Sequence, residues 1–134
     1  MDKTFIDKLA FIEIQNEQIL VSLSKGKAVW YIPGGKRELN ETDEQALIRE
    51  VKEELTVDLI PESIKYYGTY EAQAHGKPEG TIVRMICYTG NFSGELAPSS
   101  EIDKIAFFSY EKRHLTTPVD FLIFDDLKKK RLLK

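Results

Sequence analysis

The sequence has a single cysteine, Cys87, and two histidines, His75 and His114. One thiol cannot form a disulfide within the chain, and this set does not supply the ligands of a structural zinc site. We therefore expect Cys87 to be a buried thiol. Long apolar runs are also missing, because the run at 119–124 is far shorter than the roughly 18 residues that a membrane span needs. The sequence predicts no transmembrane helix.

A secretory leader is missing as well. Residues 1–10 alternate charged and apolar side chains, with no basic start followed by an apolar stretch. We therefore expect a cytoplasmic protein. The composition is 42% hydrophobic, 10% aromatic and 31% charged, which is typical of a folded soluble chain. At 134 residues the chain has the length of one domain, predicted to cover residues 1–134.

The net charge of −3 is small, and it argues mildly against a nucleic-acid polymer as partner. This charge is unevenly distributed. Residues 41–54 hold six acidic and two basic residues, which makes −4, whereas the remaining 16 acidic and 17 basic residues make +1. The acidic charge is therefore concentrated in one segment.

Patterns of apolar residues and turn residues predict several strands and two helices, with no repeat or linker. The expected hairpins pair 8–14 with 18–24 and 64–74 with 81–90, and further strands are expected at 30–32 and 104–110. Residues 91–100 are expected to form a loop that can include a short strand. A helix is predicted from Thr42 to Leu55, with Thr42 as its N-cap. A last helix is expected to begin at Pro118, with Thr117 as N-cap and Asp120 three residues later. We interpret the whole as one α+β domain.

Three glutamates share one face of the first predicted helix. Glu50, Glu53 and Glu54 are spaced i, i+3 and i+4, so their carboxylates are expected to converge. Acidic helix faces are more often simply solvated. However, these glutamates lie in the last turns, where the helix dipole and their mutual repulsion both disfavour negative charge. A bound cation would reverse both penalties, and an all-oxygen site favours Mg²⁺ or Mn²⁺ over zinc or copper.

The same residues resemble a known motif. Gly35, five residues, Glu41, seven residues and then residues 49–57 (Arg-Glu-Val-Lys-Glu-Glu-Leu-Thr-Val) are similar to the Nudix box, G-x5-E-x7-R-E-U-x-E-E-x-G-U with U apolar. Eight of the nine specified positions over these 23 residues match. The departure is Thr56, where the family usually has the glycine that eases a left-handed helix end.

The resemblance covers nearly the whole chain, and it implies the Nudix fold, an α/β/α sandwich with a mixed β-sheet between helices. It also implies hydrolysis of a nucleoside diphosphate linked to another moiety, by attack of water on a phosphorus of the pyrophosphate. Metal ions in such a site neutralise phosphates and help to generate hydroxide from water. A P-loop enzyme and a serine hydrolase are both excluded, because the chain has neither a P-loop nor a G-x-S-x-G sequence.

The resemblance assigns roles residue by residue. It implies that Glu50, Glu53 and Glu54 bind Mg²⁺ or Mn²⁺, together with the Gly35 carbonyl, and that Arg49 and Glu41 orient these ligands. In the MutT-like branch a glutamate from a late loop joins the metal site, and Glu101 is the best match. Glu101 is otherwise a surface acid of a loop. The general base stays open between a helix glutamate such as Glu53 and Glu101.

Four other residues are candidates for substrate binding, each with a structural alternative. Lys36 and Arg84 can contact phosphates, although Arg84 can instead pair with a carboxylate across the sheet. His75 lies in a glycine-rich turn and is either a plain exposed residue or a contact to substrate. Asp120 lies near where MutT-like enzymes contact the base, or it is a helix cap.

The expected substrate is a small nucleotide, with no nucleic-acid polymer and no membrane as partner. The short single-domain format and the position of Glu101 favour a MutT-like enzyme that converts a nucleoside triphosphate or a modified (oxidised) nucleotide to a monophosphate. Hydrolysis of ADP-ribose or a nucleotide sugar is the alternative, as is a nucleotide-binding Nudix module without catalysis. Small Nudix domains often dimerise, so a homodimer is compatible with the resemblance.

Overall fold

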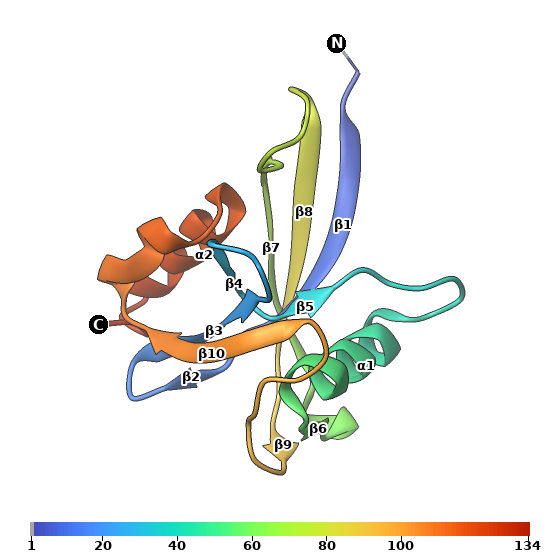
Figure 1. Cartoon of the computed structure of the whole chain (residues 1–134), viewed down its shortest axis with the longest axis vertical. Coiled ribbons are helices and arrows are strands. Elements are labelled where there is room, and N and C mark those ends of the chain that lie inside the picture. Colours follow the sequence, from blue (N-terminus) through green and yellow to red (C-terminus); the bar gives the residue numbers. More distant parts are fainter. Residues whose placement is uncertain (1) are drawn as a thin grey trace.

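The computed structural model describes residues 2–134, and Figure 1 shows its strands and helices in chain order. The strands are β1 Thr4–Phe11, β2 Ile14–Gln15, β3 Gln18–Ser24, β4 Trp30–Tyr31, β5 Gly34–Gly35, β6 Asp58–Leu59, β7 Lys65–Gln73, β8 Thr81–Thr89, β9 Phe92–Ser93 and β10 Ile102–Phe108. The α-helices are α1 Asp43–Leu55 and α2 Pro118–Lys129, and short 3-10 helices cover Pro61–Ser63 and Tyr110–Leu115. Within this range, no helix combines the length and apolar character needed to cross a membrane.

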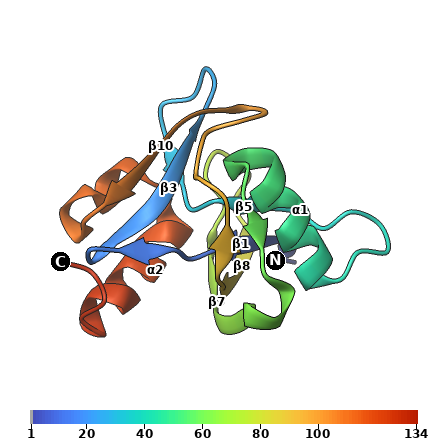
Figure 2. The ribbon, with the colours of Figure 1, turned by 90° about the horizontal axis from the view of Figure 1, so that it is seen from below.

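Strand β1 lies inside a mixed sheet of order β5-β1-β8-β7. It runs parallel to β8, while β8 and β7 form the predicted antiparallel hairpin. Side chains of β1 alternate between two cores: Leu9 and Phe11 pack with α1, whereas Ala10 packs with α2. Figure 2 shows α1 and α2 on opposite sides of β1 and β8. The predicted sandwich of a mixed sheet between helices is thus confirmed.

The first predicted hairpin is only partly correct. Of the predicted strand 8–14, only Ile14 pairs with β3; together with Gln15 it forms β2, before a tight turn at Asn16 and Glu17 with positive φ at both residues. Residues Lys8–Phe11 belong to β1 and pair with β8 instead. The reason is burial: consecutive buried residues from Leu9 to Ile12 need a layer on each face, which an interior strand provides and a two-stranded hairpin does not.

Helix α1 begins and ends as its sequence predicts. The Thr42 hydroxyl accepts a hydrogen bond from the Gln45 N–H, and the Gln45 side chain accepts one from the Thr42 N–H, which forms a capping box. At the other end Thr56 takes the left-handed conformation, with φ 65°. A β-branched residue is strained there, and the Thr56 hydroxyl offsets part of this cost by donating to the Glu95 carbonyl at 3.1 Å. The turn therefore survives the loss of the usual glycine.

A close approach of two strands positions the turn that precedes α1. Gly34 of β5 pairs with Ala10 of β1, and a Cβ at Gly34 would lie 1.9 Å from the Leu9 carbonyl oxygen. Its φ of 148° is also unfavourable for other residues. Glycine is therefore required, and it allows the turn to lie against both β1 and the last turns of α1. Cys87 lies in the core that packs against α2, and it is a free and fully buried thiol, as predicted.

Candidate active site

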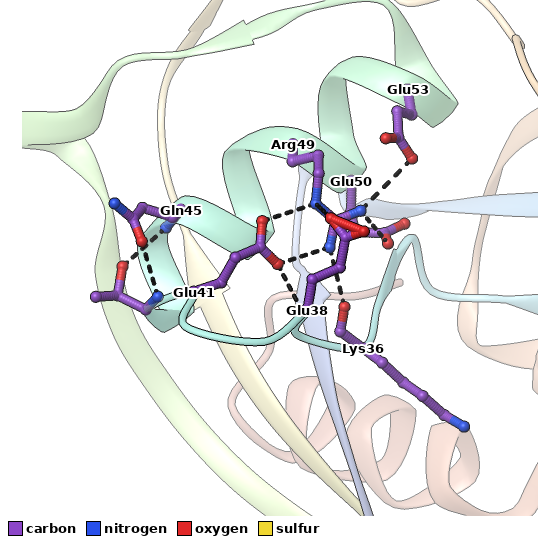
Figure 3. A network of polar contacts seen from close by, with 8 residues as sticks. Lys36, Glu38, Glu41, Gln45, Arg49, Glu50 and Glu53 are labelled. Carbon is purple, nitrogen blue, oxygen red and sulfur yellow. Dashed lines mark hydrogen bonds and ion pairs between the residues drawn. The ribbon is translucent and has the colours of Figure 1, made fainter.

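Arg49 is the centre of a polar network on α1 (Figure 3). Its Nε and Nη2 donate to the two carboxylate oxygens of Glu41, both at 2.8 Å. Its Nη1 donates to Glu50 Oε1 at 2.9 Å, and its Nη2 also donates to the Lys36 carbonyl at 3.1 Å. Glu53 Oε2 lies 3.6 Å from Nη1. One guanidinium thus connects α1 to the loop that follows the two glycines, a use of the planar fork that lysine cannot reproduce.

This network keeps the loop acid charged. The Arg49 guanidinium and the Glu38 N–H both donate to Glu41, and they lower the pKa of its carboxyl to about 2. In return, the hydrogen bond with Glu41 raises the pKa of Arg49 above its usual value. Both groups are therefore ionised at neutral pH. This geometry matches the orienting role that the resemblance implies for Arg49 and Glu41.

Glu54 is a buried carboxyl, 6% exposed, which faces the glycine turn. Its Oε1 accepts a hydrogen bond from the Gly34 N–H at 3.1 Å. Burial, followed by the charges of Glu50 and Glu101, raises the pKa of Glu54 to about 8. The Ser100 hydroxyl donates to Glu101 at 2.6 Å and lowers the pKa of that carboxyl. The fold thus brings the late-loop acid Glu101 beside the acids of α1, where the resemblance placed it.

The acids of α1 are nevertheless not gathered into one cage. Among residues 2–134, no three Asp, Glu, His or Cys side chains are close enough together to form a cation-binding cluster. The convergence of Glu50, Glu53 and Glu54 predicted from their spacing is therefore incomplete in this structure, and their role as metal ligands stays a prediction. Like charges repel, and each carboxylate turns instead to the donor it can reach: the first two to Arg49 and the third to the Gly34 N–H.

The residues present do fit a hard divalent cation. The candidate donors are all oxygens, from four carboxylates and the Gly35 carbonyl, as Mg²⁺ and Mn²⁺ prefer. Burial also raises the pKa of Glu50, and the neighbouring carboxylates Glu53 and Glu101 raise it further. A cation between these groups would relieve the crowding of negative charge. Mg²⁺ or Mn²⁺ therefore suits the donor set.

Glycine at position 35 leaves the space that the Glu50 side chain occupies. A Cβ there would lie 2.6 Å from the Glu50 carboxyl carbon, and the flexible end of Glu50 would have to move. We expect Gly35→Ala to lower kcat/KM about tenfold to a hundredfold with little loss of thermal stability, because it displaces the candidate metal ligand Glu50 rather than a core residue. Steady-state kinetics and thermal melts check this. Gly90→Ala, whose Cβ would meet nothing closer than 3.5 Å, is the matched control; equal kinetics for the two variants would contradict the prediction.

Two adjoining hollows share part of their lining, and the first of them contains Glu54. The first, which we call the glycine hollow, has a volume of about 270 Å³ and is lined by Gly34, Gly35 and Glu54, with Lys8 and Lys27 among the other residues. The second, which we call the α2 hollow, has a volume of about 230 Å³ and lies against the start of α2. Its lining includes the predicted residues Lys36 and His75, together with Lys8, Tyr31 and Lys77. Lys8 and Tyr31 line both hollows.

Arg84 pairs with a carboxylate across the sheet, which was the alternative to a contact with phosphate. Its Nε lies 3.0 Å from Glu71 Oε2, directly across the β7–β8 ladder, and its Nη1 lies 3.7 Å from Asp7 Oδ1. Its guanidinium also lies over the Phe5 ring at 4.2 Å. Arg84 lines neither hollow. Its charge is already paired, and the predicted contact with phosphate is not supported.

Asp120 lies beneath the α2 hollow rather than on its wall. It is 0% exposed, and its Oδ2 accepts a hydrogen bond from the Thr117 hydroxyl at 3.0 Å, while its Oδ1 has no partner within the described residues. Helix α2 begins as predicted, with Thr117 at the N-cap position and Pro118 as the first helical residue, but the Thr117 hydroxyl donates to Asp120 and does not cap the helix. With no exposed surface, Asp120 is not presented to a ligand, so the predicted contact with a base is also not supported.

Burial of Asp120 predicts a pH dependence of stability. Loss of solvent raises the pKa of its carboxyl from 3.8 to about 7, against the opposing effects of Thr117 and Lys8. Between these values the unfolded chain loses a proton that the folded chain keeps, so the free energy of unfolding falls as pH rises. We expect the free energy of unfolding of Asp120→Asn not to fall in this way. The stability of this variant relative to wild type should therefore increase from about pH 4 to about pH 7. Denaturant melts across this range test it; the exposed control Asp103→Asn should follow wild type, and parallel curves for Asp120→Asn would refute the prediction.

Two residues of the α2 hollow were missed by the sequence reasoning. Lys8 directly precedes the apolar residues 9–12, and the alternation of β1 places it on the side that faces α2, together with Ala10. That alternation is a signal that could have identified it. Lys77 lies in the loop between β7 and β8, and no local pattern connects it to β1 or α2. It was therefore accessible only from the tertiary structure.

Comparison with known proteins agrees with this geometry. The model of the NUDIX domain family matches residues 9–125. The chain is 30% identical over 99 residues to an ADP-ribose pyrophosphatase of Methanocaldococcus jannaschii, which covers 72% of this chain and 57% of that protein. A stretch of 30 residues is 60% identical to an 8-oxo-dGTP diphosphatase of Proteus vulgaris, covering 22% of this chain and 27% of that one. The chain thus spans less than two thirds of the length of either curated relative.

A solved structure shows the same fold at low sequence identity. The MutT protein of Methanosarcina mazei superimposes with a TM-score of 0.74 at 17% identity, and the match covers 98% of both chains. At this identity the likeness concerns the fold alone. It supports the sandwich described above over nearly the whole length of the chain.

Proposed function

The chain belongs to the Nudix family, and on that premise we propose that it hydrolyses a pyrophosphate bond in a nucleoside diphosphate linked to another group, with Mg²⁺ or Mn²⁺. The observation that carries the proposal is the complete set of acids around the glycine turn. Glu50 and Glu54 line that turn, Arg49 braces the first of them, and Glu101 joins them from a distant loop. A family member without catalysis would have no need of the whole set.

The residues have distinct tasks in this reaction. Glu50, Glu53, Glu54, Glu101 and the Gly35 carbonyl would hold the cation. When bound, Mg²⁺ or Mn²⁺ neutralises charge on the phosphates and lowers the pKa of bound water.

The protein's own contribution is placement and proton transfer. Water attacks one phosphorus, the bond from that phosphorus to the bridging oxygen breaks, and a carboxylate accepts the proton of the water. Glu53 and Glu101 both remain candidates for this base. The side chain of Glu53 is 49% exposed and can reach solvent, whereas Glu101 lies beside Glu54. Arg49 holds α1 and the loop together throughout.

The substrate that we favour is a nucleoside triphosphate or a modified, for example oxidised, nucleotide, with a nucleoside monophosphate as product. Its support is the position of Glu101 in the late loop and the local identity to an 8-oxo-dGTP diphosphatase. ADP-ribose or a nucleotide sugar is the alternative, and the longer match to an ADP-ribose pyrophosphatase favours it. The two relatives thus point to different groups beyond the pyrophosphate.

A substrate panel tests the proposal. Loss of the substrate and formation of phosphorylated products, including the nucleoside monophosphate, are measured by chromatography with nucleoside triphosphates, oxidised and methylated nucleotides, nucleotide sugars, ADP-ribose and dinucleoside polyphosphates, each with Mg²⁺, Mn²⁺ or a chelator. We expect metal-dependent turnover of at least one class and none with the chelator. Absence of turnover across the panel would refute the proposal, and tight nucleotide binding without hydrolysis would point to a binding module instead.

A further inference from the structure

Residues 36–42 form the loop between β5 and α1, and this loop extends away from the two larger sheets (Figure 1). Leu39, near its tip, is 92% exposed, so burial of apolar surface does not hold the tip in place. The position of the loop therefore depends on polar contacts at its base. Arg49 supplies one set of these contacts from α1. A second arginine, Arg37, supplies another set from the loop itself.

The Arg37 guanidinium joins the loop to two other elements. Its Nη1 donates a hydrogen bond to Oδ1 of Asp43, the first residue of α1. Its Nη2 donates to Oδ2 of Asp7, in β1, at 3.3 Å. The loop, α1 and β1 are therefore connected through one side chain. The planar fork of arginine suits this role, because its two terminal nitrogens can donate to two different carboxylates at once.

Both carboxylates that Arg37 contacts are also held by groups of β8. The Tyr88 hydroxyl donates to the other oxygen of Asp43 at 2.6 Å. Asp7 Oδ1 lies 3.7 Å from Arg84 Nη1, and Asp7 and Arg84 are direct partners in the pairing of β1 with β8. Arg37 thus belongs to a connected network rather than to an isolated surface ion pair, and a network restrains its members more strongly.

Helix α1 is consequently tied to its surroundings by polar contacts near both ends. At the last turn, the Glu54 carboxyl accepts a hydrogen bond from the Gly34 N–H. At the first turn, Asp43 accepts from Arg37 and from Tyr88. Apolar packing also presses α1 against the sheet, but this attraction is non-directional. The rotation and tilt of the helix are therefore set largely by the two polar contacts.

The orientation of α1 matters because the candidate metal ligands come from both sides of this contact. The Glu50 carboxylate belongs to α1, whereas the Gly35 carbonyl belongs to β5, two residues before Arg37. We propose that Arg37 is a positioning residue for the reaction, which keeps Glu50 and the Gly35 carbonyl in the relative position that binds the divalent cation. This inference rests on the proposed function and adds a residue that touches neither metal nor substrate.

Two other roles for Arg37 are less consistent with its surroundings. A direct contact with substrate is disfavoured, because Arg37 lines neither the glycine hollow nor the α2 hollow and both terminal nitrogens already donate to carboxylates. A surface ion pair without a role in the reaction would contribute only a little to stability. Substrate contact would change KM, and a surface ion pair would change neither kinetics nor metal binding. Positioning predicts a change in metal binding.

Binding of Mn²⁺ without nucleotide, measured by calorimetry, tests the positioning role apart from hydrolysis. Arg37→Met keeps an extended side chain but removes both hydrogen bonds. We expect its Kd for Mn²⁺ to rise about threefold to thirtyfold, the range for residues that act on a site without touching its ligand. Arg37→Lys keeps the charge and should give a smaller rise. The matched control Arg113→Met removes another ion-paired arginine of similar exposure and should bind Mn²⁺ like wild type.

A double-mutant cycle tests whether Arg37 acts through Asp43. Asp43→Asn removes the charge that Arg37 contacts, but its side-chain oxygen can still accept from the Tyr88 hydroxyl. In this background, Arg37→Met should weaken Mn²⁺ binding less than it does in wild type, because the contact is already impaired. Fully additive effects of the two substitutions would overturn the inference.

Kinetics provide the last comparison. With a nucleotide that the wild type hydrolyses, kcat of Arg37→Met at a fixed Mg²⁺ concentration should fall about threefold to thirtyfold, while KM for the nucleotide changes little. Unchanged Mn²⁺ binding, or a rise in KM alone, would overturn the inference. If Arg37→Met does not fold, as judged by circular dichroism, Arg37→Lys replaces it in each comparison. Weaker Mn²⁺ binding in the variant of a protein that hydrolyses no nucleotide would uphold the positioning of the metal site and refute the proposed function.

Discussion

Glu53→Gln is expected to lower kcat by about 10²–10⁴-fold, the range typical of removing a general acid–base group, while the protein stays folded. Glu53 lies near the C-terminal end of α1, and its side chain is 49% exposed. Among residues 2–134, its one ion pair is a 3.6 Å contact with Arg49. Glutamine keeps the size and the helix propensity but removes the negative charge and the proton-accepting oxygen. The large effect is therefore expected in chemistry and not in stability.

The matched control for this substitution lies on the same helix. Glu44→Gln removes an exposed carboxylate from the first turn of α1, at the opposite end of the helix from Glu53. We expect near-normal kcat and a small loss of stability from the helix dipole. Titration of both variants with Mg²⁺ during turnover, with circular dichroism as a check of folding, separates the outcomes. If Glu53→Gln retained turnover within threefold of wild type, Glu53 would be neither ligand nor base.

Arg49→Lys is expected to damage both activity and stability, although it preserves the charge. The two-pronged contact of the guanidinium with Glu41, its bond to Glu50 and its bond to the Lys36 carbonyl cannot all be made by one ammonium. We expect kcat/KM to fall about tenfold to a hundredfold, as for the loss of groups that orient metal ligands. We expect a loss of about 1–2 kcal/mol in the free energy of unfolding, because the network is partly solvent-exposed.

Arg113→Lys controls for the loss of a guanidinium as such. Arg113 pairs with Asp125 at 3.6 Å in the C-terminal part of the chain, and it lines neither hollow. Chemical denaturation and steady-state kinetics on both variants give the comparison. A wild-type kcat/KM in Arg49→Lys would show that the network is a surface feature with no bearing on the site.

Local elements were predictable because their causes are local. The N-cap at Thr42 depends on residues within one turn of α1, whereas the left-handed end at Thr56 also uses the distant Glu95 carbonyl. The β7–β8 hairpin was likewise predicted, because its two strands are separated by a short glycine-containing turn. In contrast, the pairing of β1 was wrong in the sequence reasoning. A parallel partner about 75 residues away, at Thr81–Thr89, leaves no local signal.

The candidate site was likewise predictable only in part. The spacing of Glu50, Glu53 and Glu54 on one helix face follows from the helix period. Their side-chain directions do not, because these depend on which donors the surrounding loops supply. Glu50 therefore turns to Arg49 and Glu54 to the Gly34 N–H, and neither choice can be inferred from spacing.

By itself, the sequence determined the acidic motif, the family and the helix that carries the candidate metal ligands, since these depend on the order and spacing of neighbouring residues. Only the tertiary structure decided that Arg84 forms an ion pair with Glu71, that Asp120 is buried, and that Lys8 and Lys77 line one hollow. The physical reason is that burial and pairing of charge depend on what packs against a residue. Those neighbours come from segments far apart in the chain.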